Sequence, residues 1–438
     1  MKSRKFKLSV VATLLTLSFN ASADATNLSL EQKLNQLQQE MDSLKKQLAE
    51  EKAARTQQMD KQVDKAVKVA VAEAVPDTTS DTSVGGYGEA SYSNYRDASV
   101  KDQIDLNRFV LFFGHRFNDR LRMYSEFEIE HAIASAGDKG EAEIEQAYIE
   151  YNLLPQANLR AGLMLMPLGI LNETHEPPTY YGVFRNEVET RIIPTTWREA
   201  GIGLQGKVLD NSLEYNVGIS SGFDARKYAK APDGAAYAIK DMHGEASQAA
   251  ANNLALYAGL NYRQPGWLLG GGLFTGKTAQ DGVGDTPTTS YAPLQGKAAR
   301  LTLWDIHGKY SIGDLELQGL YARGTLGDTQ AINDAAGIVP GDGNDAAPKL
   351  FYGWYGQAAY HLWRKGDMRL TPFVRYERYN TQARVDNGYT VNALNHDTVT
   401  TVGANFYLSR EVVLKADWQN YKIDNLKDRV NLGVGYMF

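Results

Sequence analysis

The sequence has no cysteine, no long apolar segment and no excess of basic residues. Without cysteine, an exported protein has to hold its fold together without disulfide bonds. The mean hydropathy of -0.41 excludes a helical membrane protein, but it does not exclude a β-barrel, whose strands are apolar on one face only. A formal charge of -6 argues against nucleic acid as a partner.

Patterns that carry catalysis are also scarce. Residues Gly218 to Gly222 match the spacing of a nucleophile elbow around Ser220, but here the motif ends an expected strand instead of joining a strand to a helix. His175-Glu176 lacks the second histidine of a zinc-protease helix and is followed by two prolines. The sequence therefore predicts no catalytic residue, no metal site and no cofactor.

The chain begins with the pattern of an export signal. Four basic residues precede a mostly apolar run over 8–19, and Ala21-Ser22-Ala23 has the small side chains of a cleavage site. The run is shorter than the ~20 residues that a spanning helix needs, so we interpret residues 1–23 as a signal peptide. Its removal takes away four positive charges and no negative ones, which changes the net charge from -6 to -10.

Residues 24–76 are predicted to form a periplasmic helix with a coiled-coil seam. The seam has apolar side chains at alternating spacings of four and three residues, namely Leu30, Leu34, Leu37, Met41, Leu44 and Leu48. We expect this seam to drive self-association, and the alternative is a single amphipathic helix that lies on the barrel or on the membrane. Leucine dominates both seam positions, so the seam does not fix the number of associating helices. Pro76 and a polar run end the helix, and residues 77–83 are predicted to be a linker.

Residues 84–438 are predicted to form an all-β transmembrane barrel of about sixteen antiparallel strands. Short turns alternate with long loops, as in outer-membrane barrels, where the short turns face the periplasm. A barrel of ~16 strands encloses a water-filled channel. The expected strands are 84–95, 102–117, 120–131, 142–153, 157–166, 200–209, 211–222, 252–263, 267–275, 298–311, 314–323, 350–364, 367–381, 395–408, 410–421 and 428–438.

Individual strands show one apolar and one polar face. In the last strand, Val430, Leu432 and Val434 alternate with small or polar residues. The same alternation places charged side chains on the lumen wall, where fixed charges select ions. The basic candidates are Arg108, Arg122, Arg160, Arg375 and Lys415, and acidic candidates on the same wall include Glu126, Glu128, Glu150, Glu377 and Asp417.

The loop over 167–199 is long and rich in charged, aromatic and proline residues, which favours a folded functional loop over a disordered one. We predict that it folds inward and constricts the pore, and the alternative is a loop packed on the rim or on a neighbouring subunit. The candidates for constriction and selectivity are Arg185, Arg191, Arg198, Glu173, Glu176, Glu187 and Glu189.

In the order of its strands the chain resembles Gram-negative outer-membrane porins, most of all the phosphate-selective porin O/P family. The resemblance covers about 84–438 and is carried by the signal peptide, the series 103–106, 146–151, 159–162 and 167–169, and the terminal Phe438. The N-terminal coiled coil is similar to that of dicarboxylate-type trimeric porins. The resemblance implies a homotrimer in the outer membrane that passes small polar or ionic solutes, with phosphate and carboxylates as candidate anions.

The chain departs from the phosphate-selective pattern in the predicted constriction. Loop 167–199 has five glutamates against three arginines, whereas phosphate-selective members line the constriction with arginines. The sequence leaves the choice between anions and cations open. Two other functions also remain open, an outer-membrane barrel enzyme and an envelope-tethering structural barrel with a closed pore.

Overall fold

The computed structural model describes residue 43 and residues 81–135, 137–229, 239–284, 291–341 and 346–438. The predicted signal peptide, the coiled-coil seam and most of the predicted linker lie outside these residues. Within the described ranges, no helix combines the length and the apolar character that crossing a membrane would require.

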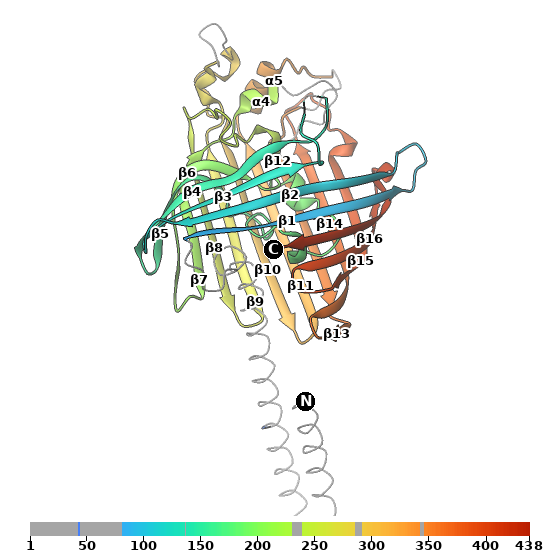
Figure 1. Cartoon of the computed structure of the whole chain (residues 1–438). Coiled ribbons are helices and arrows are strands. Elements are labelled where there is room, and N and C mark those ends of the chain that lie inside the picture. The colour runs from blue at the N-terminus through green and yellow to red at the C-terminus, as the bar shows by residue number, and fades with distance from the viewer. Residues whose placement is uncertain (1–42, 44–80, 136, 230–238, 285–290, 342–345) are drawn as a thin grey trace, which may run out of the picture. The chain divides into compact units, whose positions relative to one another are not determined.

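The described strands form one closed antiparallel barrel (Figure 1). β1 pairs with β2 on one side and with β17 on the other, so the sheet has no free edge. The strands are β1 Thr82–Tyr95, β2 Gln103–Arg116, β3 Leu121–Glu130, β4 Ala142–Leu154, β5 Ala157–Leu165, β6 Arg198–Val208, β7 Leu213–Ser221, β8 Leu254–Gln264, β9 Trp267–Gly276, β10 Leu301–Ile312, β11 Leu315–Leu326, β12 Leu350–Tyr360, β13 Trp363–Lys365, β14 Met368–Arg384, β15 His396–Tyr407, β16 Val412–Tyr421 and β17 Arg429–Met437.

The barrel has sixteen strands, because β12 and β13 are two parts of one strand. Both pair with β14, and the ladder is interrupted only at residues 361–362. The predicted strand count is therefore confirmed among the described residues, and each strand end lies within three residues of its predicted position. β1 begins at Thr82, inside the range predicted for the linker.

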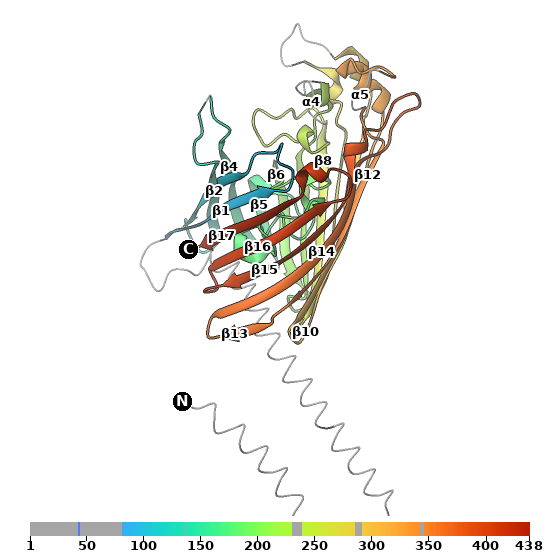
Figure 2. The ribbon, with the colours of Figure 1, turned by 90° about the vertical axis from the view of Figure 1, so that its right-hand side faces the viewer.

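The connections alternate between short turns at one end of the barrel and longer segments at the other (Figure 2). The longer segments contain short helices, and α4 and α5 lie near each other beyond the strand ends in Figure 1. The helices are η1 Pro177–Thr179, α3 Val188–Arg191, α4 Ala225–Ala229, η2 Ile239–Met242, η3 Gln280–Gly282, η4 Ala292–Leu294, α5 Thr329–Ala336, η5 Ala393–Asn395 and η6 Asn425–Lys427.

The outer face of the barrel is apolar and carries two rows of exposed aromatic side chains. On β10, Trp304 and Tyr310 both point outward and are six residues apart, which corresponds to about 20 Å along a strand. Trp304 packs on Tyr321 of β11 at 5.6 Å between ring centres, and Trp354 of β12 is opposite Tyr321 in the ladder. At the short-turn end, Trp267 is opposite Tyr310, and Tyr360 is the last residue of β12. Aromatic rows that bracket an apolar band are typical of outer-membrane barrels.

The inner face is polar, as the strand alternation predicts. On β16 the outward Leu414 and Trp418 are exposed, whereas the inward Lys415 and Asp417 are buried. On β17, Leu432 points outward, and the inward Asn431 is fully buried. These lumen residues are buried inside a barrel of this size because the segment between β5 and β6 covers them.

Candidate functional site

The segment between β5 and β6, residues 166–197, lies inside the barrel. Near its start, the backbone N–H of Gly169 donates to Asp305 on β10 at 3.0 Å. Farther along, the N–H of Val183 donates to Asp417 on β16, and that of Glu187 donates to Glu377 on β14, each at 2.6 Å. β14 is eight strands from β5 in a ring of sixteen, so this inner loop crosses the barrel interior.

Glycines on the inner face make room for the inner loop. A Cβ atom at Gly435 on β17 would lie 2.3 Å from the Cβ of Pro177, and one at Gly433 would lie 3.0 Å from Val183. On β8, a Cβ at Gly259 would lie 2.6 Å from the Cβ of Pro167. Only glycine lets the wall and the loop backbone approach this closely without a shift.

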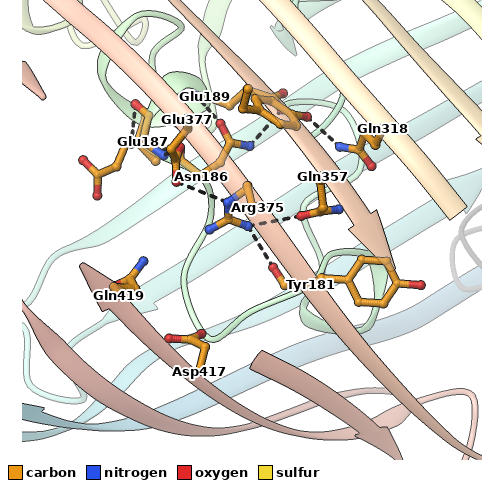
Figure 3. Close-up of polar contacts among 12 residues, drawn as sticks. Tyr181, Asn186, Glu187, Glu189, Gln318, Gln357, Arg375, Glu377, Asp417 and Gln419 are labelled. Atoms are coloured by element: carbon orange, nitrogen blue, oxygen red, sulfur yellow. Dashed lines mark hydrogen bonds and ion pairs between the residues drawn. The ribbon is translucent and has the colours of Figure 1, made fainter. Parts of the chain in front are cut away.

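Glu189 organises the centre of the inner loop. Its carboxylate accepts hydrogen bonds from the backbone N–H groups of Ile170 and Leu171, each at 2.7 Å, and from the side chain of Asn186 at 3.0 Å. The hydroxyl of Tyr355 on β12 donates to the same carboxylate at 2.8 Å. Glu189 therefore joins two parts of the loop to the barrel wall instead of facing the water (Figure 3).

Arg375 on β14 is a second anchor of the inner loop (Figure 3). Its guanidinium donates to the backbone carbonyl of Tyr181 at 3.1 Å and to Gln357 at 3.4 Å, and it pairs with Glu377 at 3.2 Å. Arg375 is only 2% exposed. This predicted lumen-wall cation therefore lies on the inner face but is covered by the loop.

Glu187 is bound to strands β14 and β16, across the barrel interior from β5. It forms an ion pair with Arg191 one helical turn later, and the hydroxyl of Tyr421 on β16 donates to it at 2.7 Å. Burial raises the pKa of this carboxyl, but Arg191 and the Tyr421 hydroxyl outweigh burial, and the net pKa lies below its usual range. Glu187 is therefore held as a carboxylate.

Arg108 and Lys415, both predicted on the lumen wall, share a buried group of side chains. Arg108 Nε donates to Glu89 at 2.8 Å, and the hydroxyl of Tyr180 donates to the same carboxylate at 2.8 Å. The ammonium of Lys415 lies 3.5 Å from the centre of the Tyr180 ring, a cation–π contact. Both cations anchor the inner loop through Tyr180.

Few of the predicted selectivity residues are open to water. Glu173 is exposed, and the side chain of Arg191 is 34% exposed. On the wall, Arg122 is exposed, and Arg160 is half-buried in an ion pair with Glu150 at 2.8 Å. The predicted residues that are buried are Arg108, Glu176, Arg185, Glu187, Glu189, Arg198, Arg375 and Lys415.

Arg198 is in a different element from the one expected. The sequence places it in the loop 167–199, but it is the first residue of β6 and pairs in register with Leu165 of β5. Its side chain forms an ion pair with Glu143 on β4 and lies 3.3 Å from Glu245. β6 therefore begins two residues before its predicted start, because Arg198 and Glu199 continue the ladder opposite Leu165 and Met164 of β5.

Sequence reasoning also missed residues that the inner loop contacts. Glu89, Glu145 and Tyr355 are buried on the inner face. The alternation of their strands was a signal that could have placed Glu89 and Tyr355 there, whereas Glu145 lies at a break in the alternation of β4. Ser220, in contrast, does not form a nucleophile elbow. It is 1% exposed on strand β7, and its hydroxyl donates to the backbone carbonyl of Ser221 at 3.0 Å.

Comparison with known proteins agrees with this fold. No protein-family profile matches the sequence. The structure of the Salmonella typhi OmpF complex with daunomycin is similar with a TM-score of 0.56 at 13% identity, over 83% of this chain and 99% of that one. OmpTdeltaL8, a loop L8 deletion mutant of OmpT, an outer membrane protein of Vibrio cholerae, gives a TM-score of 0.50 at 11% identity, over 82% and 100%.

These two likenesses show the fold of outer-membrane barrels. A protein from Aquifex aeolicus (strain VF5) is much more similar in sequence, with 33% identity over 368 residues. The match spans 81% of this chain and 80% of that protein, whose description is "Uncharacterized protein". The chain therefore belongs to the same family as this Aquifex aeolicus protein.

Proposed function

We propose that this protein is an outer-membrane porin through which small polar or charged solutes diffuse passively. The observation that carries the proposal is the inner loop, which crosses a closed barrel of sixteen strands and is hydrogen-bonded to β10, β14 and β16. A barrel of this size without such a loop would leave a wide aqueous channel, so a loop fixed at its centre would set the size limit of the solutes.

The charges that water reaches would govern ion preference. On the inner loop these are Glu173 and Arg191, which have opposite signs, and Arg122 adds a positive charge on the wall. The buried predicted residues would act by holding the loop in place. Phosphate or carboxylates remain candidate solutes, and they would have to pass Glu173.

We further propose that the protein is a homotrimer in the outer membrane of a Gram-negative cell. In this arrangement residues 24–76 form a periplasmic three-stranded coiled coil through the predicted leucine seam. Deletion of 27–75 followed by mass measurement of the detergent-solubilised protein tests the role of the seam. A mass that falls to that of a monomer is expected. A trimer of otherwise unchanged composition would show that the seam is not the main contact that holds the subunits together.

The test of the porin function is conductance of the purified protein in a planar bilayer, with the zero-current potential measured under a salt gradient. Stepwise conductance in groups of three is the expected result. Folded protein that gives no conductance would contradict the proposal and would favour a barrel enzyme or an envelope-tethering barrel with a closed pore. The proposal assigns no catalytic step to the chain.

Two charge variants test which side chains face the solute path. Glu173→Gln should shift the zero-current potential toward anion preference, and Arg191→Gln should shift it toward cation preference. Glu411→Gln is the matched control, because Glu411 is an exposed carboxylate in the short turn between β15 and β16. Equal potentials for all of these proteins would show that the ions follow a path away from the inner loop.

A further inference from the structure

A buried group of carboxylates and one histidine lies between the inner loop and strands β3 and β4. Glu126 and Glu128 come from β3, Glu143 and Glu145 come from β4, and His175 comes from the loop. Glu145 is completely buried, and Glu126, Glu128 and His175 are each at most 3% exposed. Burial of so many carboxylates away from water is costly unless cations compensate them.

A β-bulge aims Glu145 into this group. Glu126 is opposite Gln146 and Phe127 is opposite Ile144, so Glu145 is the extra residue of β4 and has no partner in the ladder. The bulge lets Glu145 and Gln146 both face inward, and Gln146 donates a hydrogen bond to Glu126 at 2.6 Å. Bulges often redirect a side chain in this way at functional positions.

The tautomer of His175 is set by the backbone of the inner loop. Its Nδ1 atom lies 2.9 Å from the carbonyl oxygen of Asn172, and a carbonyl only accepts, so Nδ1 carries the proton. In the neutral ring, Nε2 then has a free lone pair. Nε2 lies 3.7 Å from Glu126 and 3.7 Å from Glu145, and it has no hydrogen-bond partner among the described residues.

This arrangement is the one that metal-binding histidines use, with one ring nitrogen held by a backbone carbonyl and the other free for the ion. The ligand atoms of Glu126, Glu145 and His175 all lie within 4.8 Å of one another, and the same holds for Glu128, Glu143 and Glu145. Both oxygens of Glu145 lack a hydrogen-bond partner in the described structure, although the side chain is fully buried.

Nearby arginines do not balance the four carboxylates. Arg108 lies 3.8 Å from Glu128, but its shorter ion pair, at 2.8 Å, is with Glu89. Arg198 pairs with Glu143 but also lies 3.3 Å from Glu245. A third buried guanidinium, that of Arg185, donates to Thr196 at 2.9 Å and also acts electrostatically on Glu128. Three arginines, two of them shared with carboxylates outside the group, still leave a negative charge beside the free nitrogen of His175.

We propose that Glu126, Glu145 and His175 bind a divalent first-row transition-metal ion, with Glu128 and Glu143 beside it. Carboxylate oxygens alone would suit calcium or magnesium, and the imidazole nitrogen favours ions such as Zn²⁺ or Mn²⁺. The bound ion would fasten the inner loop to β3 and β4. This site is independent of whether the barrel conducts.

The test is metal binding by the full-length, untagged protein, extracted from outer membranes in detergent and stripped with EDTA. Calorimetric titration with Zn²⁺ should give one saturable site per chain. Glu145→Gln and His175→Gln should each weaken binding at least tenfold. Glu150→Gln and His361→Gln are matched controls with unchanged affinity, because Glu150 pairs with Arg160 and His361 has Glu316 at 2.7 Å as its carboxylate partner.

A measurement on the wild-type protein covers the case in which a variant does not fold. Zn²⁺ should slow amide hydrogen exchange in the peptide that spans 172–179. Three results would each overturn the proposal: Zn²⁺ binding that does not saturate, a Zn²⁺ affinity of both Glu145→Gln and His175→Gln that equals that of the wild type, and amide exchange in this peptide that Zn²⁺ does not change. The group would then be neutralised by protons and by His175 as an imidazolium.

Discussion

The hydroxyl of Tyr421 should stabilise the closed position of the inner loop by a measurable amount. It donates to the buried carboxylate of Glu187 at 2.7 Å, and Glu187 is the N-cap residue of α3 inside the barrel. Hydrogen bonds to charged groups contribute about 1.5–3 kcal/mol. Tyr421→Phe removes this bond and should raise the population of the detached loop about 10- to 150-fold.

Because the chain has no cysteine, a single engineered thiol can report on this opening. Val188 on α3 is fully buried and packs near Gly353 on β12, so a thiol in Val188→Cys reacts only when the loop leaves the wall. Valine and cysteine are both small and apolar, which keeps the packing close to that of the native protein. The rate of thiol labelling in detergent then follows the population of the open loop.

Tyr215→Phe, in the same Val188→Cys background, is the matched control. The hydroxyl of Tyr215 also donates a hydrogen bond, to the carbonyl of Gln156 at 2.9 Å, but Tyr215 shares the outward face of β7 with the exposed Val217 and Ile219, so its side chain points away from the inner loop. Its removal should leave the labelling rate within twofold. Equal labelling rates for Tyr421→Phe and Tyr215→Phe would refute the view that Glu187 anchors the loop.

Three further predictions concern packing, pH and accessibility. Gly435→Ala brings a Cβ to 2.3 Å from Pro177 and should lower the free energy of unfolding by about 1–3 kcal/mol in a denaturant titration. Gly356→Ala is the control, because no atom lies within 4 Å of its Cβ, and it should leave the free energy of unfolding unchanged. The pKa of His243 is lowered from 6.5 to about 3, first by burial and then by the cations Lys227, Arg198 and Lys240. The neutral ring therefore stabilises the fold above pH 6.5. This contribution, at most about 5 kcal/mol, is lost as the pH falls toward 3. Exchange of the imidazole C2 proton, followed by mass spectrometry, measures this pKa, and a midpoint near 6.5 would contradict the buried position. Glu173→Cys should react with a charged thiol reagent added to the bilayer and change the current at once, and an unreactive thiol would mean that Glu173 is outside the solute path.

Much of the barrel was predictable because its signals are local. Alternation of side chains follows from the geometry of a strand, so the apolar set of β17 and the charged set of β16 could be assigned to opposite faces from their spacing alone. Turns at 265–266 and 313–314 contain glycine and are tight, and they separated neighbouring strands correctly. The length and composition of the segment 167–199 also marked it as a folded loop.

The candidate site was less predictable because its partners are distant in the sequence. Glu187 meets Glu377 and Tyr421, which are 190 and 234 residues away. The glycines that accommodate the inner loop have no distinctive neighbours along the chain, and the bulge that turns Glu145 inward depends on the register between β3 and β4. Such register is set by hydrogen bonds between strands, which a single sequence does not display.

By itself, the sequence determined the class of fold, the number of strands and the face of charged side chains in regular strands such as β16, because these follow from the two-residue repeat of a strand and from local turn chemistry. The tertiary structure alone decided which of those charges face water and which are covered. Closing the ring brings Arg375, Lys415 and Glu89 into contact with a loop that enters from the far side, and burial then makes them anchors of that loop instead of open charges along the solute path.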